Sequence, residues 1–226
     1  MQKTTKFVAA CCCWPQSQAS RDRVIKAASE LENWEEIKDI VTRHRVLPLV
    51  HLAVKDLGEV PQSFKNWASQ GARSAALRAM RLTHDCINID AALQAEGLEP
   101  LHLKGPVLAQ ITYGSIALKI SYDLDIFVAK HDVLKAARIL EQAGYKASGH
   151  IEKISQRQVT ALVGNFKDMA FKHPTGTVIE LHWRFTNTNS LLAELLQDLA
   201  RQHVKVADLA NLDTLKAPQL LSYLCV

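Results

Sequence analysis

The stretch SYDLDIFV, residues 121–128, places two aspartates inside a short segment of strand-forming apolar residues. Because side chains alternate across a strand, Leu124 and Ile126 face one way while Asp123 and Asp125 face the other. The segment therefore predicts a strand with one apolar face and with two neighbouring carboxylates on its opposite face. These carboxylates either face water or hold a cation, because like charges this close repel one another unless a cation or a proton separates them.

A second stretch, TVIELHWRF at residues 177–185, has the same two-faced pattern. Ile179 and Leu181 share an apolar face, and Glu180 and His182 share the polar one. Three carboxylates on adjacent strands can hold two divalent cations, an arrangement used for in-line phosphoryl or nucleotidyl displacement. Oxygen ligands of this kind favour magnesium or manganese over zinc. The alternatives are a glutamate that faces solvent and a histidine with a structural hydrogen bond.

The third candidate element is LHLKGPVLAQ, residues 101–110, which predicts a strand, a turn at Gly105 and then a helix. Free backbone N–H groups at a helix start bind phosphate with the help of the helix dipole, and glycine leaves that approach open. Lys104 would add a positive charge to such a site. Lys119, four residues before Asp123, is either a second cation of the site or an ordinary exposed lysine.

Apolar residues at helical spacing predict that the chain before Gly97 is helical. Asn33 and Glu36 predict a capping box at the start of the second helix. Pro48 is expected to interrupt the next apolar segment, and Gly71 is expected to bend or divide the long third helix. These three helices are predicted within residues 20–33, 33–46 and 62–96.

After Gly97, short strands alternate with helices, which predicts an α+β fold. The expected organisation is a helical region at residues 1–96 and, at residues 97–226, a core with a small mixed sheet flanked by helices. The sequence HPTG predicts the turn of a hairpin. The final apolar segment LLSYLCV favours a fragment of a longer protein. In this half, helices are predicted at 131–144, with Asp132 near its cap and Gly144 as its end, and at 190–202.

Composition describes an ordinary soluble globular protein, with 48% apolar and 22% charged residues among 226. A net charge of +4 is too mild to predict a nucleic-acid partner, and it is compatible with an anionic small molecule. No apolar run reaches the length of a membrane span. The five cysteines, three of them consecutive at 11–13, favour reduced thiols in a cytoplasmic protein. The basic and apolar start of the chain resembles a lipoprotein signal but is too short for one, so a first core helix is the preferred interpretation.

Taken together, the quoted motifs and a helix ending in AGY resemble the bacterial uncharacterised nucleotidyltransferase family, within the DNA polymerase beta-like superfamily. The segments LKG, DLDIFV and ELHW carry the resemblance, and the helical half, with NWEEIKDIVTRHRVLPLVHLAV, extends it over most of the chain. The resemblance implies that Asp123, Asp125 and Glu180 are catalytic and bind Mg²⁺ or Mn²⁺. It implies that Gly105 receives the phosphates of a nucleoside triphosphate, ATP included.

Two positions depart from the superfamily pattern. The usual Gly-Ser or Gly-Gly pair of the nucleotide-binding motif is here Lys104-Gly105. Lys119 stands four positions before the first acid, where an arginine commonly lies. Lysine keeps the charge but loses the two-pronged contact with phosphate. With His182, these residues complete the expected nucleotide-binding set.

The resemblance implies transfer of a nucleoside monophosphate to a hydroxyl of a small molecule or a protein, with release of pyrophosphate. The alternative is a module of the same fold that senses nucleotide or binds a partner without turnover. A helical interaction protein with exposed acids is a third interpretation.

Overall fold

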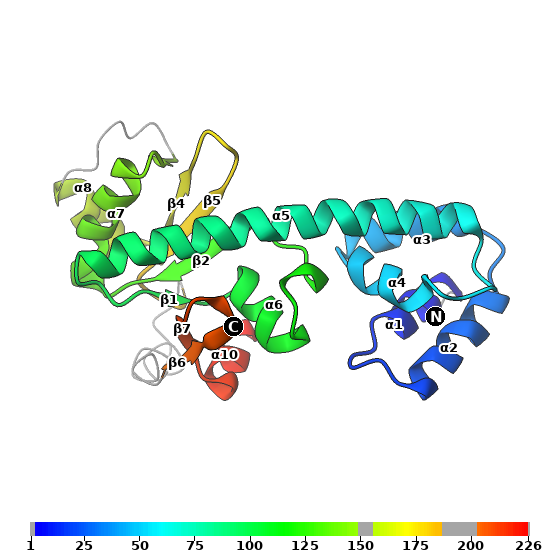
Figure 1. The fold of residues 1–226 in the computed structure, drawn as a ribbon. Helices are drawn as coiled ribbons and strands as arrows, with labels where there is room; N and C mark the ends of the chain where they lie inside the picture. The colour runs from blue at the N-terminus through cyan, green and yellow to red at the C-terminus, as the bar shows by residue number, and fades with distance from the viewer. Residues whose placement is uncertain (1–2, 149–155, 187–202, 226) are drawn as a thin grey trace. The chain divides into compact units, whose positions relative to one another are not determined.

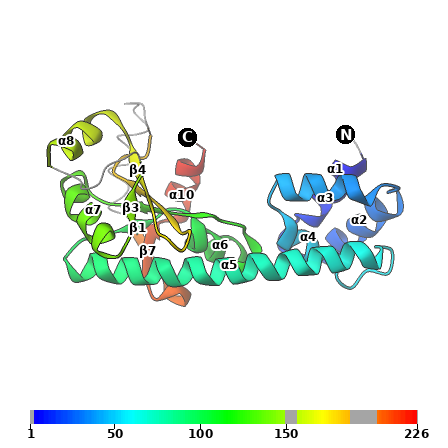
Figure 2. The same ribbon diagram turned by 90° about the horizontal axis from the view of Figure 1, so that it is seen from above.

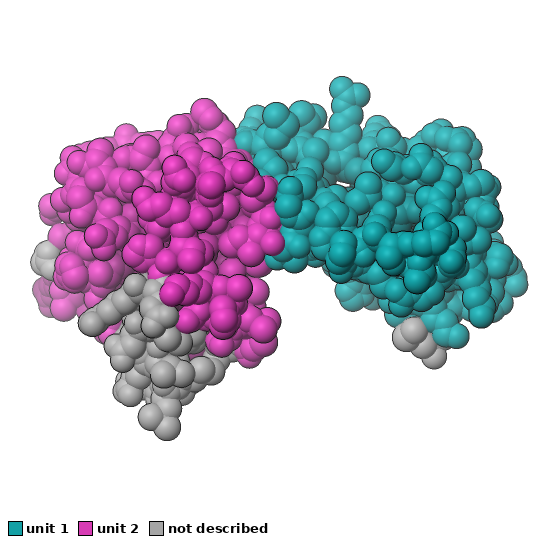
Figure 3. Space-filling model, turned by 60° about the horizontal axis from the view of Figure 1, so that its bottom comes forward, with its two compact units in different colours: residues 1–81, 112–120 teal, residues 82–111, 121–226 magenta. Residues whose placement is uncertain are grey.

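The structure, a computed structural model, describes residues 3–148, 156–186 and 203–225 and divides the chain into two compact units (Figures 1 and 3). Unit 1 comprises residues 1–81 and 112–120, and unit 2 comprises residues 82–111 and 121–226. The boundary falls within the long helix α5, Gln62–Ala95, which contributes to both units. Among the described helices, none combines the length and the apolar character needed to cross a membrane.

Unit 1 is helical, as predicted. An aromatic cluster lies at its centre: the rings of Phe7 and Trp34 are 5.4 Å apart, and those of Trp34 and Phe64 are 4.9 Å apart. Phe7 belongs to the first helix and is fully buried, which confirms that this segment is a core helix. The elements of unit 1 besides α5 are α1 (Lys3–Cys11), α2 (Gln18–Ser29), α3 (Trp34–Arg43), α4 (Leu47–Val54) and the 3-10 helix η1 (Ile116–Leu118).

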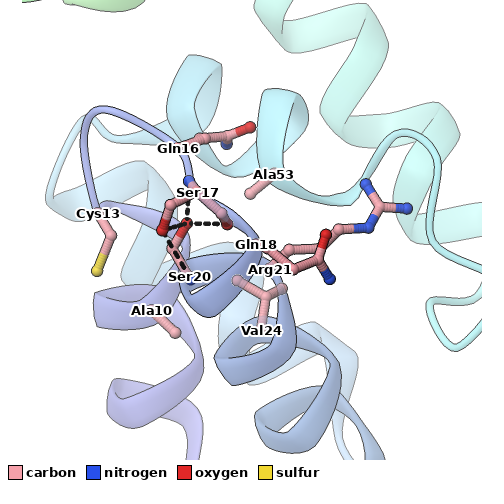
Figure 4. A pocket seen from close by; sticks show the side chains of 9 residues that line it. All are labelled: Ala10, Cys13, Gln16, Ser17, Gln18, Ser20, Arg21, Val24 and Ala53. Carbon is pink, nitrogen blue, oxygen red and sulfur yellow. Dashed lines mark hydrogen bonds between the residues drawn. The ribbon is translucent and has the colours of Figure 1, made fainter.

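Helix caps in unit 1 match the sequence only in part. The side chain of Asn33 caps α3 by accepting hydrogen bonds from the backbone N–H groups of Glu35 and Glu36, as expected. The Glu36 carboxylate, however, accepts a hydrogen bond from Thr4 of α1. A reciprocal capping box forms instead at α2, between Ser17 and Ser20. These two serines line a small cavity of about 250 Å³ (Figure 4).

The structure contradicts two expectations about helix breaks, the interruption at Pro48 and the division of α5 at Gly71. Pro48 does not interrupt a helix, because it lies in the first turn of α4, where its missing N–H leaves no helical hydrogen bond unmade. Gly71 does not divide α5, which is continuous over its 34 residues. A Cβ atom at Gly71 would lie 2.7 Å from a methyl carbon of Leu47, so this glycine lets α4 approach α5 closely.

Unit 2 is built around a five-stranded mixed sheet with strand order β1-β2-β5-β4-β3. Strands β2 and β5 are parallel neighbours, and the other pairs are antiparallel. This confirms the predicted small mixed sheet flanked by helices. Its strands are β1 (Leu101–His102), β2 (Asp123–Phe127), β3 (Lys146–Ala147), β4 (Asp168–Lys172) and β5 (Val178–His182).

The turns of unit 2 confirm the local predictions. His173 accepts a hydrogen bond from the backbone of Gly176 in the turn that joins β4 to β5. Gly144 has a φ of +89° after α7 (Val133–Gln142) and ends that helix. The side chain of Asp132, however, makes no capping hydrogen bond and lies 3.4 Å from His131. The predicted helix at 190–202 lies outside the described residues.

The two faces of the sheet carry different elements. On one face, α5 runs across the strands, with α7 beside its end (Figures 1 and 2). On the other face, an apolar cluster joins β1 to the C-terminal elements through Leu103, Phe185 and Tyr223. The remaining elements of unit 2 are α6 (Gly105–Tyr113), α8 (Gln156–Asn165), the hairpin β6 (His203–Val206) and β7 (Leu212–Leu215), and α10 (Ala217–Leu224), together with the 3-10 helices η2 (Lys130–Asp132) and η3 (Ala207–Leu209).

Candidate functional site

The register between β2 and β5 brings the predicted acids together. Asp125 lies directly beside Glu180 in this parallel pair, and His182 is the next residue on the same face of β5. Asp123 begins β2 on the face that Asp125 shares. Carboxylate groups from two strands, far apart in the sequence, therefore face one region of unit 2.

Each strand of this pair is held in place by its apolar side. Leu124 and Ile126 of β2 are buried, as are Ile179 and Leu181 of β5. A slip of one residue in either strand would move these side chains out of the core. The packing of the apolar face thus sets the position of the acids on the opposite face.

The turn between β1 and α6 lies against the start of β2. Gly105 has a φ of +61°, and a Cβ atom there would lie 3.3 Å from the carbonyl oxygen of Asp123. Both facts favour glycine at this position. The preceding residue, Lys104, extends its ammonium group to Asp125, with 2.9 Å between Nζ and Oδ1. The turn predicted to receive phosphate is therefore adjacent to the acids.

His182 is fully buried among carboxylates. Its Nε2 lies 3.3 Å from Asp125 and 3.5 Å from Glu180, and its Nδ1 lies 3.5 Å from Asp168 of β4. These contacts are close enough for charge attraction, but neither ring nitrogen has a partner in hydrogen-bond geometry among the described residues. A buried polar atom without such a partner is unusual in a purely structural position.

The charges of this cluster act on one another. Burial alone would raise the pKa of the Asp125 carboxyl, but the His182 ring and the Lys104 ammonium group hold that pKa below its ordinary value. His182 is also the main cause that lowers the pKa of Glu180. Burial and the charges of Asp125 and Glu180 raise the pKa of Asp123. The acids of the cluster outnumber its two basic side chains, Lys104 and His182, so its negative charge is only partly neutralised.

The donor atoms fit a divalent cation. One ligand atom from each of Asp125, Glu180 and His182 lies within 4.8 Å of the others. Asp123 is not part of that group, although its raised pKa shows that it lies within electrostatic reach. Carboxylate oxygens suit magnesium and manganese, and an added imidazole nitrogen is compatible with manganese. Only 2% of the Asp125 side chain is exposed, so a cation bound there would be partly shielded from water.

Of the predicted set, the structure brings together Lys104, Asp125, Glu180 and His182, with Gly105 and Asp123 beside them. Lys119 belongs to unit 1, where it follows η1, and its role at the site stays a prediction.

The structure adds two residues that the sequence analysis missed. Asp168 opens β4 and pairs in register with His182. Counting back from the predicted turn at residues 173–176 could have found it, because the hairpin fixes this register. Tyr223 comes from α10, is buried, and lies under the Lys104 ammonium group, 5.3 Å from Nζ to the ring centre. No local signal distinguished it from the other apolar residues of its segment.

Comparison with known proteins agrees with this geometry. A family described as uncharacterised nucleotidyltransferase matches residues 30–226, which include the whole of unit 2 and much of unit 1. No curated protein and no solved structure matches the chain. Because the match covers most of the sequence and includes every acid of the site, the chain belongs to the uncharacterised nucleotidyltransferase family.

Proposed function

We propose that the protein transfers a nucleoside monophosphate from a nucleoside triphosphate, ATP among them, to a hydroxyl group, with release of pyrophosphate. The observation that carries this proposal is the β2–β5 register, which sets Asp125 beside Glu180 and next to the Gly105 turn. Membership of a nucleotidyltransferase family supports the same chemistry. The acceptor is a small molecule or a protein, because a net charge of +4 is mild for a partner of long nucleic acids. We place this activity in the cytoplasm, in keeping with five free cysteines.

Asp123, Asp125 and Glu180 would hold the divalent cation, magnesium or manganese, with His182 as a further donor. Such a cation neutralises phosphate charge and makes an acceptor hydroxyl more acidic. The chain itself supplies the phosphate position, because the first turn of α6 has backbone N–H groups without partners inside the helix, Pro106 excepted, and Gly105 leads the chain into that turn at a φ of +61°.

Two side chains have separate duties beside this position. Lys104 has its ammonium group at the edge of the acids, with 37% of its side chain exposed, so it can turn from Asp125 to a phosphate oxygen. Glu180 is more exposed than Asp125, at 37% against 2% of the side chain, and is placed to take the proton of the acceptor hydroxyl. Rate enhancement then comes mainly from positioning and charge neutralisation.

The test uses the full chain with magnesium, each labelled nucleoside triphosphate in turn, and a cell extract as the source of acceptors. We expect metal-dependent transfer of label, and we expect the Asp123→Ala, Asp125→Ala double variant to lose it. Glu59→Gln, an exposed change in unit 1, is the matched control.

The same assay separates the second candidate function, a sensor that binds nucleotide without turnover. The ion pair between Lys104 and Asp125 favours that alternative, because the ammonium group competes with a cation for the carboxylate. Metal-dependent nucleotide binding without label transfer or pyrophosphate release would support the sensor. Absence of both metal and nucleotide binding would refute both functions.

A further inference from the structure

A cavity of about 1010 Å³ lies in unit 2 at the end of β2 that is away from Asp123. Its wall combines apolar side chains, among them Leu98, Leu101 and Phe127, with charged side chains from the loop before β1, from η2 and from the β6–β7 hairpin. Cavities of roughly 300–1,000 Å³ with this mixture of apolar and polar groups typically bind small organic molecules.

The cavity and the Gly105 turn lie toward opposite ends of the same strand. Phe127 shares its face with Asp123 and Asp125 and follows Asp125 by two residues, a distance of about 7 Å along a strand. Gly105 lies against the other end, because a Cβ atom there would touch the carbonyl oxygen of Asp123. Asp125 therefore stands between the turn and the cavity.

A chain of contacts connects the cavity wall to the acids. The ring of Phe127 stacks on Phe185 at 4.5 Å with an angle of 4° between the planes, and Phe185 contacts Tyr223 at 5.6 Å. Tyr223 lies under Lys104, which pairs with Asp125. Contacts between aromatic rings thus connect the cavity wall to Lys104 and Asp125, the groups proposed to lie beside the reacting phosphate.

We propose that this cavity receives the acceptor. The inference rests on the proposed nucleotidyl transfer, in which the attacking oxygen and the leaving oxygen lie in line on opposite sides of the phosphorus. If the leaving pyrophosphate is held at the Gly105 turn, the attacking hydroxyl comes from the Phe127 end. The acceptor oxygen forms a bond to the α-phosphorus while the bond to pyrophosphate breaks. Pyrophosphate takes that electron pair, and the hydroxyl proton passes to Glu180.

The charges of the wall indicate the chemical class of the acceptor. His131 and His203 each have a neighbouring aspartate at 3.4 and 3.7 Å. Lys130 and Lys205 have no ion-pair partner among the described residues. Glu99 is the one acid of the wall that also lacks such a partner there. The wall of this cavity therefore has two lysines and three acids, Glu99, Asp132 and Asp213, and by itself it carries no surplus of positive charge.

A second cavity, of about 570 Å³, shares Lys130 and His131 with the first, and its described wall has basic side chains but no acid, so the surplus of positive charge lies there. Its wall adds Lys135, which pairs with Glu96, and Arg138, which has no ion-pair partner among the described residues. Apolar side chains beside free ammonium groups suit an organic molecule that has both an apolar part and an anionic group. We assign the acceptor to this class.

The probe for this class is the dye anilinonaphthalene sulfonate, which has flat rings and a single negative charge. We expect one dye molecule to bind per folded chain, with fluorescence as the signal. Lys130→Glu and Lys205→Glu should each weaken dye binding by about tenfold, the effect of roughly 1.4 kcal/mol. Lys172→Glu, an exposed change on β4 outside the cavity, should leave it within about twofold. Thermal unfolding of every variant confirms that each is folded.

The second arm measures whether the dye lowers label transfer to extract acceptors while metal-dependent nucleotide binding is unchanged. Dye binding that is indifferent to both lysine changes would overturn the assignment, as would direct competition between dye and nucleotide, which would make the cavity a nucleotide site. Dye binding with the expected lysine dependence, in a wild-type protein that transfers no label, would support the anion site and refute the proposed transfer instead.

Discussion

Two buried histidines lie in unit 2 on opposite faces of the same sheet, and their surroundings differ. His102 of β1 pairs beside Ile126 on the α5 face. Its Nε2 lies 2.8 Å from Asp90, and its Nδ1 lies 3.2 Å from the sulfur of Cys86. His182 on the acid face is surrounded by three carboxylates, but neither of its ring nitrogens has a hydrogen-bond partner among the described residues.

This difference separates a polar cluster with a structural role from the cluster at the proposed site. Around His102, each ring nitrogen has a hydrogen-bond partner on α5, Cys86 for one and Asp90 for the other. These bonds connect α5 to β1 and leave neither ring nitrogen without a partner. Around His182, the acids outnumber the cations, and the charges of Asp125 and Glu180 add to burial in raising the pKa of Asp123. Burial is the same at both sites, and what separates them is the surplus of negative charge.

The largest effect expected from this comparison is on the acid face. Glu180→Gln should lower label transfer by about a thousandfold or more, because it removes a carboxylate that faces the reacting groups. Its free energy of unfolding should fall only slightly, because His182 lowers the pKa of Glu180 and so favours its charged form in the folded protein, but the side chain is partly exposed. Transfer assays and urea unfolding measure the two quantities. A large loss of stability without a specific loss of transfer would make the acid cluster structural.

The reverse outcome is expected on the α5 face. Asp90→Ala should lower the free energy of unfolding by about 3–5 kcal/mol, because it leaves the buried His102 without its carboxylate. Label transfer per folded molecule should be nearly unchanged. Asp90→Asn, which keeps a hydrogen-bonding group, should be less destabilising. If Asp90→Ala were as stable as wild type, the cluster would have no structural role.

The His102 cluster should also make stability depend on pH. Burial alone would lower the pKa of His102, but Cys86 and Asp90 raise that pKa to about 10. An unfolded histidine has a pKa of about 6.5, so below that pH the proton is bound in both states and the stabilisation is complete. As pH rises from about 6.5 toward 10, folding must take up a proton. Stability should then fall by up to about 1.4 kcal/mol per pH unit. Urea unfolding between these limits should show this slope in wild type and a smaller slope in His102→Gln.

Lys104 tests the surplus charge directly. Lys104→Met should raise the affinity for Mn²⁺ by about tenfold, because it removes the ammonium group that lies 2.9 Å from Asp125. Nucleotide binding should weaken in the same variant. Lys104→Arg keeps the charge and should change metal affinity less. Titration calorimetry measures both ligands, and an unchanged metal affinity in Lys104→Met would show that the lysine does not compete with a cation.

The smallest effect is expected at the turn. Gly105→Ala should lower the free energy of unfolding by about 1–2 kcal/mol, because its φ of +61° disfavours a side chain and the added methyl would crowd Asp123. Gly58→Ala is the control, since nothing lies within 4 Å of a Cβ atom there and its φ is not positive. Chemical unfolding of both variants makes the comparison. Equal stabilities would mean that the turn tolerates a side chain.

Much of this site could be predicted because its signals are local. Alternation along residues 121–128 and 177–185 gives the two faces of each strand without any knowledge of neighbours. The predicted hairpin turn is equally local, and it fixes the register of Asp168 with His182. The pairing of β2 with β5, and hence the meeting of Asp125 with Glu180, follows from these patterns only once a shared sheet is assumed.

The features that were missed depend on contacts between distant segments. Cys86, Asp90 and His102 are unremarkable in the sequence, and only the packing of α5 on β1 brings them together. Gly71 has the local signature of a helix break, whereas the space it leaves for Leu47 decides its role. Tyr223 reaches Lys104 only because the C-terminal elements cover the acid face of the sheet. The spacing of apolar residues along the chain does not indicate which distant segments will be in contact.

The parallel pairing of β2 with β5 has a consequence for how the protein comes into being. During synthesis, the segment with both aspartates leaves the ribosome well before the segment with Glu180. Contacts between such distant residues form late in folding. A nascent chain therefore carries an incomplete, inert set of acids until the hairpin closes and β5 docks. The set of acids on which the proposed transfer depends is therefore complete only once β5 has paired with β2, and a chain without that pairing should not consume nucleotide.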